Sequence, residues 1–307
     1  MKISAVIVTF NSCSLIAECL DSVMSQPYAD KEAIVVDNGS SDGTADLIKS
    51  YYPQIRVICN ASNEGAAGAR NQGIKAASGD WIVTLDADTR LSNDFFFCFE
   101  DFIKSGRNGR VGIVAPKILY QDRRTIYSLG NELTPLRRFY DIGKGRRDSG
   151  RYKGIKKVFG ACSAAAFYNR EMLEDIKVDG AYLDPRFFFM AEDVDVAWRA
   201  RKKGWGVLSC YGCVAYHDGD SSRTHRKARN FYSIRNRLLM VFKNDDPLYI
   251  FLWLWPLVIF ELLRFFFLLA KGSASVYVAA LLSASRIIRG GRGTSGRGYE
   301  KIETCPF

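Results

Sequence analysis

The chain has 307 residues, a formal net charge of +10, and a hydrophobic fraction of 48%. This length admits one domain of ordinary size together with an appendage. The positive charge requires an anionic partner, but the basic residues are not interleaved with aromatic residues in a recognisable module, which argues against a nucleic-acid-binding protein.

The first half of the chain alternates short, β-branched apolar runs with amphipathic patterns. Strands are predicted at residues 3–10, 33–36, 55–59 and 81–85. Helices are predicted between and after them, at residues 15–24, 45–51 and 64–77. This alternation predicts an α/β fold with a mostly parallel, Rossmann-like sheet that has helices on both faces. Such sheets bind ligands in the crevice beyond the carboxyl ends of their strands.

Two carboxylates, Asp86 and Asp88, follow the fourth predicted strand. Mg²⁺ and Mn²⁺ prefer hard oxygen ligands and keep part of their coordination shell for water or phosphate groups. Acids at a strand end therefore suit an open metal site that takes a phosphorylated ligand. Two acids this close also occur often in solvated loops, so the interpretation depends on the rest of the chain.

The second half of the chain is less regular. A strand is predicted at residues 111–120, and a strand with a following turn at residues 158–168. Residues 121–157 between them are rich in arginine, lysine and glycine, and we interpret them as a long mobile insertion that is solvated or attracts an anionic ligand. Glu192 and Asp193 then begin a helical pattern.

Cys210 and Cys213 form a Cys-x-x-Cys sequence that is followed by His217. The spacing suits a structural zinc site. Against zinc, residues 207–210 and 214–216 predict short strands on which the two cysteines would face opposite sides, and there is no second Cys-x-x-Cys pair. We therefore assign no zinc. The cysteines show no disulfide spacing and are expected to be reduced, in a cytoplasmic setting.

The C-terminal part of the chain is strongly apolar. Residues 248–270 approach the length of a membrane span but contain Pro256, Glu261 and Arg264. Two central charges cost about 5–7 kcal/mol on the insertion scale, which makes spanning marginal. With a second apolar patch at residues 276–288 and its arginines, this predicts a hairpin of helices in the inner leaflet. The alternative is a helix buried against the protein or a second copy of it.

Together these segments resemble the family-2 glycosyltransferases, whose fold is called GT-A. The resemblance covers roughly residues 1–240 and rests on blocks in a fixed order. The blocks are VIVTFN at residues 6–11, VVDNGSSDGT at 35–44, NEGAAGARNQG at 63–73, LDAD at 85–88 and FMAEDVD at 189–195. The second half is most similar to bacterial rhamnosyltransferase-type members. The resemblance implies transfer of a hexose or deoxyhexose from a nucleotide diphosphate, UDP or dTDP, to a hydroxyl, with inversion.

This resemblance and the chemistry of the reaction give the acids their roles. The departing nucleoside diphosphate develops negative charge, so Mg²⁺ or Mn²⁺ held by Asp88, Asp86 and His217 would stabilise it. Inversion requires a base on the opposite face, and the resemblance assigns this role to Asp193, with Glu192 as a positioning residue. The alternative for both acids is a favourable interaction with a helix dipole.

The donor nucleotide is expected at the same edge of the sheet. The candidate donor-binding residues are Thr9, Asp37, Asn38, Asn63, Arg70, Asn71 and Asp86. Asp37 would accept hydrogen bonds from the base or the ribose. The alternatives are an Asx turn for Asp37, a surface ion pair for Arg70 and a helix cap for Asn63. Ser221, Ser222 and Arg223 are further candidates for contact with the diphosphate.

We expect a catalytic domain at residues 1–245, with a nucleotide-binding half to about residue 110 and an acceptor half after it, and a membrane-associated segment at residues 246–307. The acceptor would be a membrane-proximal glycan or a lipid-linked molecule of polysaccharide or cell-wall biosynthesis. No signal peptide is predicted, and the expected location is the cytoplasmic face of the inner membrane, as a peripheral or monotopic protein.

Two other functions stay open. The first is a processive polysaccharide synthase of the same fold. The lack of a Gln-x-x-Arg-Trp segment after Asp193 argues against it. The second is a non-catalytic membrane adaptor, against which stands the joint presence of Asp37, Asp86, Asp88 and Asp193. A homodimer also stays open, and the sugar and the acceptor are not identified by the sequence.

Overall fold

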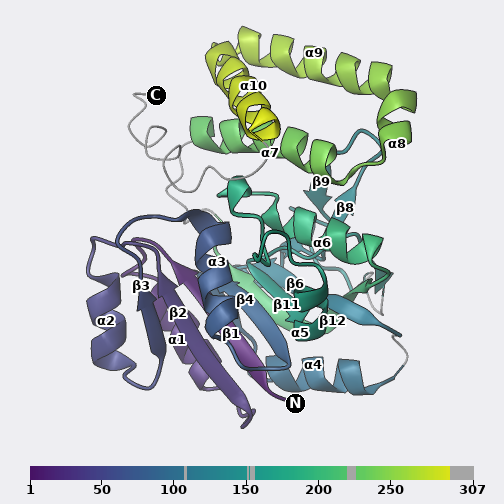
Figure 1. The fold of residues 1–307 in the computed structure, drawn as a ribbon. Helices are drawn as coiled ribbons and strands as arrows, with labels where there is room; N and C mark the ends of the chain where they lie inside the picture. The colour runs from purple at the N-terminus through teal and green to yellow at the C-terminus, as the bar shows by residue number, and fades with distance from the viewer. Residues whose placement is uncertain (107–108, 151, 153–155, 220–225, 291–307) are drawn as a thin grey trace. The chain divides into compact units, whose positions relative to one another are not determined.

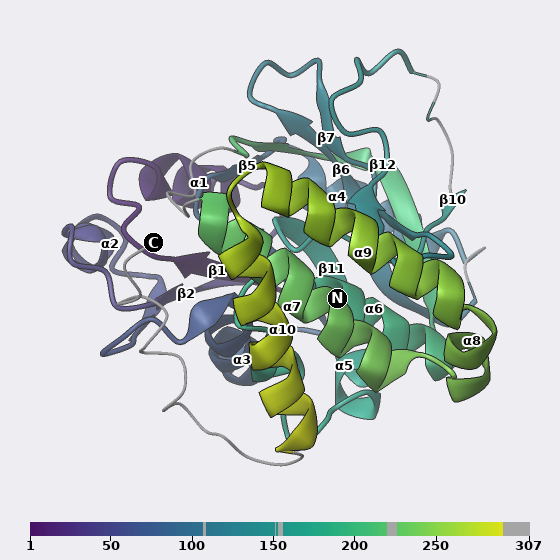
Figure 2. The ribbon, with the colours of Figure 1, turned by 90° about the horizontal axis from the view of Figure 1, so that it is seen from above.

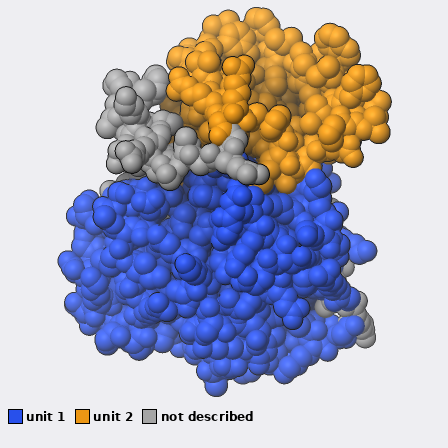
Figure 3. Space-filling model, in the orientation of Figure 1, with its two compact units in different colours: residues 1–133, 139–188, 192–222 blue, residues 134–138, 189–191, 223–307 orange. Residues whose placement is uncertain are grey.

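The computed structural model describes residues 1–106, 109–150, 152, 156–219 and 226–290. The chain divides into two compact units (Figure 3). The first unit consists of residues 1–133, 139–188 and 192–222, and the second of residues 134–138, 189–191 and 223–307. The first unit contains all the candidate catalytic and metal-ligating residues.

The first unit is built on a mixed sheet with the strand order β10-β12-β6-β11-β4-β1-β2-β3 (Figure 1). The strands predicted in the first half are confirmed and run parallel: β1 (Ile3–Thr9), β2 (Lys31–Asp37), β3 (Arg56–Cys59) and β4 (Trp81–Asp86). The others are β5 (Thr89–Leu91), β6 (Val111–Tyr120), β10 (Lys156–Lys157), β11 (Ala165–Asn169) and β12 (Gly206–His217). β11 runs antiparallel between β4 and β6, and β12 is parallel to β6.

Helices cover both faces of this sheet, as the sequence predicted. One face packs against α1 (Ile16–Met24), α2 (Thr44–Tyr51) and α4 (Phe95–Lys104). The other packs against α3 (Gly65–Ala76), α5 (Arg170–Asp175) and α6 (Glu192–Lys202). Side chains alternate along β1, so Ile3, Ala5 and Ile7 join the first core and Val6 the second.

Helix α3 is rich in glycine and alanine, and the structure gives a reason for one of its glycines. A Cβ atom at Gly73 would overlap the side chain of Val6 and lie 3.3 Å from that of Val36. Glycine therefore lets the helix backbone lie close to β1 and β2. The same helix carries Arg70 to the carboxyl edge of the sheet.

The region after β6 differs from the long mobile insertion that we expected. It forms the short strands β7 (Ile126–Ser128), β8 (Asn131–Leu133) and β9 (Phe139–Asp141). β7 pairs with β6, and β8 pairs with β9. Lys117 and Asp148 form an ion pair of 2.9 Å. The segment therefore contains short paired strands where its composition indicated a loop, and most of its described basic residues lie in the turns and bends that connect these strands.

The strand predicted at residues 158–168 is also shorter, because β11 begins at Ala165. The N–H of Phe159 donates to the carbonyl of Asn131 at 2.9 Å, and the N–H of Asn131 donates to the carbonyl of Gly160 at 2.8 Å. Phe159 and Gly160 are thus hydrogen-bonded to β8, and the chain joins the central sheet only at Ala165, where β11 begins.

Among its described residues, the second unit contains the helices α7 (Arg226–Asn244), α8 (Pro247–Leu252), α9 (Leu254–Ala270) and α10 (Ala274–Arg289). α10 packs against both α7 and α9 (Figure 2). The unit therefore begins earlier in the chain than residue 246, the position at which the composition changes. It includes the polar helix α7, against which the apolar helix α10 packs.

The charged side chains that interrupt the apolar run have hydrogen-bond partners inside this unit. Glu261 accepts hydrogen bonds from Arg237 of α7 and from the hydroxyl of Tyr277 on α10, the latter at 2.7 Å. Arg264 donates to the hydroxyl of Ser233 at 3.0 Å. Within the residues described, the structure contains no helix with the length and apolar character needed to cross a bilayer.

Candidate active site

Pairing among β4, β5 and β12 brings the predicted metal ligands together. Asp86 ends β4, and Asp88 directly precedes β5. β5 runs antiparallel to β12, and this register sets Thr89 opposite His217, the last residue of β12. As a result, Nε2 of His217 lies 3.1 Å from Oδ1 of Asp88 and 3.6 Å from Oδ2 of Asp86.

This cluster has the composition of a divalent metal site. One ligand atom from each of Asp86, Asp88 and His217 lies within 4.8 Å of the others, and the part of the chain that is described holds no second group of this kind. Two carboxylates and an imidazole suit Mn²⁺ or Mg²⁺. Nδ1 of His217 is buried without a hydrogen-bond partner among the described residues, whereas Nε2 faces the carboxylates.

The charges in the cluster depend strongly on one another. Burial favours the neutral imidazole, but Asp86 and Asp88 outweigh it and raise the pKa of His217 to about 9. Burial also opposes the charge on Asp86, yet Arg70 and His217 lower the pKa of that carboxyl to about 2. The two carboxylates therefore hold a cationic imidazole, and a metal ion would take the place of its proton.

Arg70 connects this cluster to the acids at the start of α6. Its buried guanidinium lies 2.7 Å from Oδ1 of Asp86 and 2.6 Å from Oε1 of Glu192. Burial disfavours the charged guanidinium, but the two carboxylates outweigh it and raise the pKa of Arg70 above its usual value. The sequence left a surface ion pair open at this position, and the structure has a buried ion pair with both acids, while the donor-binding role of Arg70 stays a prediction.

Asp193, in the first turn of α6, is oriented by two backbone N–H groups. The N–H of Ser163 donates to its Oδ2 at 3.2 Å, and the N–H of Val194 donates to its Oδ1 at 2.8 Å. Burial, and then the charge of Glu192, raise the pKa of Asp193 to about 7. A carboxyl group with this pKa is well matched to proton transfer at neutral pH.

The carboxyl ends of β1 and β2 carry Thr9, Asp37 and Asn38. Asp37 accepts a hydrogen bond of 3.2 Å from the N–H of Ser40 within its own loop, and Asn38 donates to Oδ1 of Asn63 at 2.8 Å. The hydroxyl of Thr9 is buried and has no hydrogen-bond partner among the described residues. These bonds organise the loops at the sheet edge, and the donor-binding roles of the four residues stay predictions.

Asn71 holds the loop that contains Tyr182 and Leu183. Its Oδ1 accepts hydrogen bonds from the N–H groups of Tyr182 at 3.1 Å and Leu183 at 2.9 Å, and its Nδ2 donates to the carbonyl of Leu183 at 2.7 Å. Both ends of the amide are therefore used within the protein. The structure gives Asn71 a loop-positioning role, and its predicted contact with the donor stays a prediction.

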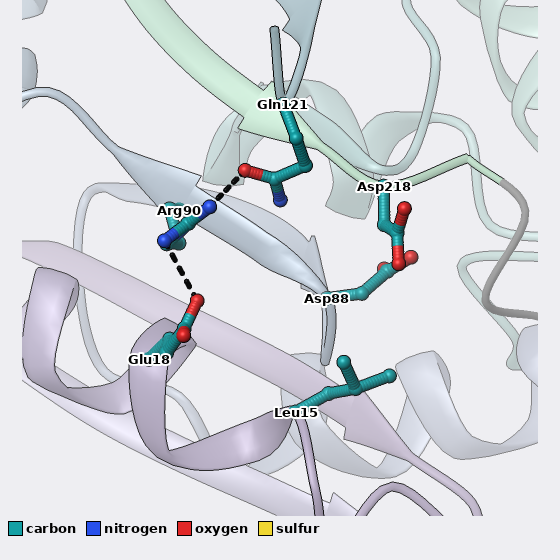
Figure 4. A pocket seen from close by; sticks show the side chains of 6 residues that line it. All are labelled: Leu15, Glu18, Asp88, Arg90, Gln121 and Asp218. Carbon is teal, nitrogen blue, oxygen red and sulfur yellow. Dashed lines mark hydrogen bonds and ion pairs between the residues drawn. The ribbon is translucent and has the colours of Figure 1, made fainter.

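A pocket of about 150 Å³ lies beside Asp88 (Figure 4). Its lining residues are Leu15, Glu18, Asp88, Arg90, Gln121 and Asp218. Arg90 forms an ion pair of 2.7 Å with Glu18 and a hydrogen bond with Gln121. Sequence reasoning identified only Asp88 among these residues. The adjacency of Asp218 to His217 was an available signal, whereas Glu18 and Gln121 lie in segments without a motif.

Tyr127 of β7 is another residue that sequence reasoning missed. Its ring packs edge-on against His217, with the ring centroids 4.5 Å apart. No local pattern indicated this contact, because it depends on the pairing of β7 with β6. The candidates Ser221, Ser222 and Arg223 lie outside the described residues.

The expectation that Cys210 and Cys213 face opposite sides is wrong. Residues 206–217 form the single strand β12, whose pairing with β6 is irregular between Cys210 and Val214. The two Sγ atoms lie 3.1 Å apart. The irregularity breaks the alternation of side chains on which the expectation depended.

Solved glycosyltransferase structures share this architecture. A mannosyltransferase from Pyrobaculum calidifontis in complex with GDP-Man and Mn²⁺ has a TM-score of 0.55 at 17% identity, over 99% of this chain and 83% of that chain. S. aureus TarS in complex with UDP-GlcNAc has a TM-score of 0.54 at 20% identity, over 80% of this chain and 68% of that chain. These similarities show the GT-A fold, a Rossmann-like α/β fold with a mostly parallel sheet.

A curated relative, the poly-beta-1,6-N-acetyl-D-glucosamine synthase of Staphylococcus epidermidis, is 29% identical over 202 residues. The match covers 64% of this chain and 45% of the relative, so the chain spans about half the length of this relative. The profile of the family described as Glycosyl transferase family 2 matches residues 4–177, which is more than half of the chain. The motifs, the fold and this match agree, and the chain belongs to glycosyltransferase family 2.

Proposed function

We propose that the protein is a metal-dependent inverting glycosyltransferase that moves a sugar from a nucleotide diphosphate to a hydroxyl group. The observation that carries the proposal is the convergence of Asp86, Asp88 and His217, whose ligand atoms lie within 4.8 Å of one another. Glu192 is joined to this cluster through Arg70, and Asp193 follows it directly. A group of candidate metal ligands linked to a carboxyl group of raised pKa is typical of a catalytic site.

In this proposal Asp193 accepts the proton of the acceptor hydroxyl as its oxygen attacks the anomeric carbon. The N–H groups of Ser163 and Val194 keep the carboxylate in one orientation. Glu192 acts through Asp193, because its negative charge helps to raise the pKa of the base. A metal ion bound by the triad would supply positive charge for the departing nucleoside diphosphate.

Replacing the base tests this assignment. Asp193→Asn should bind the donor with nearly unchanged affinity and lose transfer by about 10²–10⁴-fold, the usual effect of a positioned base. Donor affinity is measured by calorimetry and transfer with a labelled nucleotide sugar. Glu171→Gln, at an exposed acid of α5, is the matched control and should leave both quantities unchanged. Unchanged turnover in Asp193→Asn would contradict the role of Asp193.

A UDP or dTDP sugar is the donor that we propose. Support for a nucleotide sugar comes from TarS, which was solved with UDP-GlcNAc, and from the mannosyltransferase, which was solved with GDP-Man and Mn²⁺. The nucleotide is identified by thermal shift with UDP, dTDP and GDP sugars, each with Mn²⁺ and with Mg²⁺. Stabilisation by GDP sugars alone would contradict the proposed donor, and stabilisation by none would contradict the function.

A processive synthase is the second candidate, because the curated relative is named as a poly-beta-1,6-N-acetyl-D-glucosamine synthase. Against it, the sequence after Asp193 contains Trp198 and Arg199 but no Gln-x-x-Arg-Trp segment. The size of the product separates the two functions. A single added sugar supports the proposed transferase, and a ladder of products at low acceptor conversion supports a synthase.

We also propose that the second unit binds the anionic cytoplasmic surface of the inner membrane as a peripheral or monotopic element. Large apolar side chains are exposed along its helices, on α9 the residues Trp255, Ile259, Leu262, Leu263, Phe266 and Phe267. Contiguous exposed apolar side chains mark a surface that a soluble monomer rarely shows. Arg286 and Arg289 on α10 supply charge for anionic lipid headgroups. Such a surface would suit a lipid-linked or membrane-proximal acceptor.

A further inference from the structure

Cys210 and Cys213 lie at an irregularity of β12 that the proposed transfer reaction does not use. Cys210 is opposite Pro116 in β6, and Val214 is opposite the next residue, Lys117. Residues 211–213 therefore have no partner in β6 and form a bulge. Because of this bulge the two side chains turn to the same side, and their Sγ atoms lie 3.1 Å apart.

The two thiols differ in their surroundings. The hydrogen bond that Cys213 donates lowers the pKa of Cys210, and the N–H groups of Gly212 and Cys213 act in the same direction against burial. Burial raises the pKa of Cys213 well above its usual value. Cys210 therefore forms a thiolate more readily than Cys213. This difference is the one expected between an attacking thiol and a resolving thiol.

A metal site explains the pair less well. Two thiolates need at least one further ligand for a closed tetrahedral site. Over the described parts of the chain, three or more metal-ligating side chains come together only at Asp86, Asp88 and His217. Among the described residues the cysteine pair therefore lacks a third metal ligand, which favours a reaction between the two sulfurs themselves.

We propose that Cys210 and Cys213 are a dithiol that a low-molecular-weight disulfide converts reversibly into an intramolecular disulfide. The thiolate of Cys210 attacks one sulfur of the small disulfide, and the other sulfur leaves as a thiolate with the bonding electrons. Cys213 then loses its proton and attacks Sγ of Cys210, which expels the second small thiol. The protein loses two electrons and two protons, and one small disulfide becomes two thiols.

The bulge gives a route for this exchange although both thiols are buried. Gly212 at its tip is exposed, and a Cβ atom placed there would meet no other atom within 4 Å. Because residues 211–213 make no ladder bonds with β6, they can open without breaking the pairing of Cys210 and Val214. Opening of the tip would bring the sulfur of Cys210 to solvent.

The test uses the full chain in glutathione buffers that range from reducing to oxidising. After equilibration, free thiols are blocked with N-ethylmaleimide, and the peptide with both cysteines is analysed by mass spectrometry. We expect two maleimide groups on this peptide in reducing buffer. In oxidising buffer we expect none, and a mass lower by two hydrogens. The exposed Cys59 is an internal reference and should carry glutathione in the oxidising buffer.

Variants assign the roles of the two sulfurs. Cys213→Ser should retain glutathione at residue 210 as a mixed disulfide, and Cys210→Ser should leave residue 213 unmodified. Cys98→Ser, at a partly exposed cysteine of α4, is the matched control and should form the disulfide as the original chain does. Two maleimide groups on the original chain in a buffer that has modified Cys59 would overturn the proposal, whatever the folding of the variants.

Discussion

Two effects that act in the same direction raise the pKa of the Asp193 carboxyl group. Burial disfavours its charged form, and the neighbouring charge of Glu192 adds to this, so that its pKa is raised to about 7. A general base acts in its ionised form. The predicted kcat/KM therefore falls about tenfold per pH unit below pH 7 and levels off above it.

Glu192→Gln tests the cause of this pH dependence. The substitution removes the negative charge that raises the pKa of Asp193 and leaves Arg70 to lower it further, so the acid limb should move to lower pH. The measurement is the pH profile of kcat/KM for the original chain and the variant. An acid limb that stays in place would contradict the electrostatic role of Glu192, even if overall activity decreased.

Asp88 directly precedes β5 and His217 ends β12, so both proposed metal ligands lie at strand ends. Asp88→Asn and His217→Ala should each weaken Mn²⁺-dependent nucleotide binding by at least about tenfold, because each removes a ligand of the triad. Calorimetry with UDP, with and without Mn²⁺, measures the effect. The exposed Asp46→Asn of α2 is the control. Unchanged Mn²⁺ dependence in both variants would refute the metal site.

At the scale of elements, α7 supports the segment that directly precedes Glu192. Phe188, Met190 and Ala191 have φ angles of 60°, 69° and 67°, a region that costs a non-glycine residue about 1–3 kcal/mol. Nδ2 of the buried Asn236 donates to the carbonyls of Phe189 at 2.8 Å and Met190 at 2.7 Å. These bonds help to hold a backbone conformation that the residues themselves disfavour.

Asn236→Ala should therefore relax this segment and displace the start of α6. We expect kcat to fall by about tenfold or more while donor affinity stays the same, since a shift of about an ångström at a base has effects of this size. The half-buried Asn230→Ala on the same helix is the control. A variant that loses donor affinity and kcat equally would show general destabilisation and not a positioning role.

Two glycines of α3 give a contrast in stability. A Cβ atom at Gly73 would overlap Val6, a stiff β-branched residue of the core, whereas one at Gly68 would only lie 3.1 Å from Cβ of Glu64. Gly73→Ala should lower the free energy of unfolding by about 1–3 kcal/mol through overpacking. Gly68→Ala should raise it by up to about 1 kcal/mol through helix propensity. Urea unfolding distinguishes the two, and equal effects would contradict the close packing of α3.

At the scale of the whole molecule, the exposed apolar side chains of the second unit predict membrane binding, which point substitutions should abolish. Leu263 and Phe266 of α9 are 65% and 59% exposed. Leu263→Glu with Phe266→Glu should abolish flotation with anionic liposomes while nucleotide affinity is retained. Tyr51→Glu replaces an aromatic residue of the first unit that is 77% exposed and should leave flotation unchanged. A double variant that still floats would contradict the membrane surface.

These substitutions are a sharper test than removal of residues 247–307. Truncation would delete Glu261, the carboxylate partner of the buried Arg237. Removing one member of a buried ion pair costs about 3–5 kcal/mol, because the remaining charge is left without compensation. A truncated chain could therefore lose membrane binding through unfolding, whereas exposed side chains of α9 can be changed without touching the ion pair.

Much of the fold and part of the site were accessible from local pattern. The parallel strands and their helices were predicted because side-chain periodicity is a property of neighbouring residues, and each apolar run ended in polar residues at a sheet edge. Asp86 and Asp88 were found in this way, since a strand end and two acids are visible within a few residues. His217 and Asp193 were assigned through the family resemblance, which depends on the order of motifs along the chain.

The tertiary structure alone decided which distant groups pair. Arg70 contacts both Asp86 and Glu192, and Glu192 is 122 residues from Arg70 along the chain. Glu261, which interrupts an apolar run in the sequence, is paired with Arg237 inside the helical unit. Cys210 and Cys213 meet because β12 bulges against β6, and the register of a strand depends on the neighbour with which it pairs. Periodicity is encoded locally, whereas buried ion pairs and bulges arise from the packing of segments that are remote in sequence.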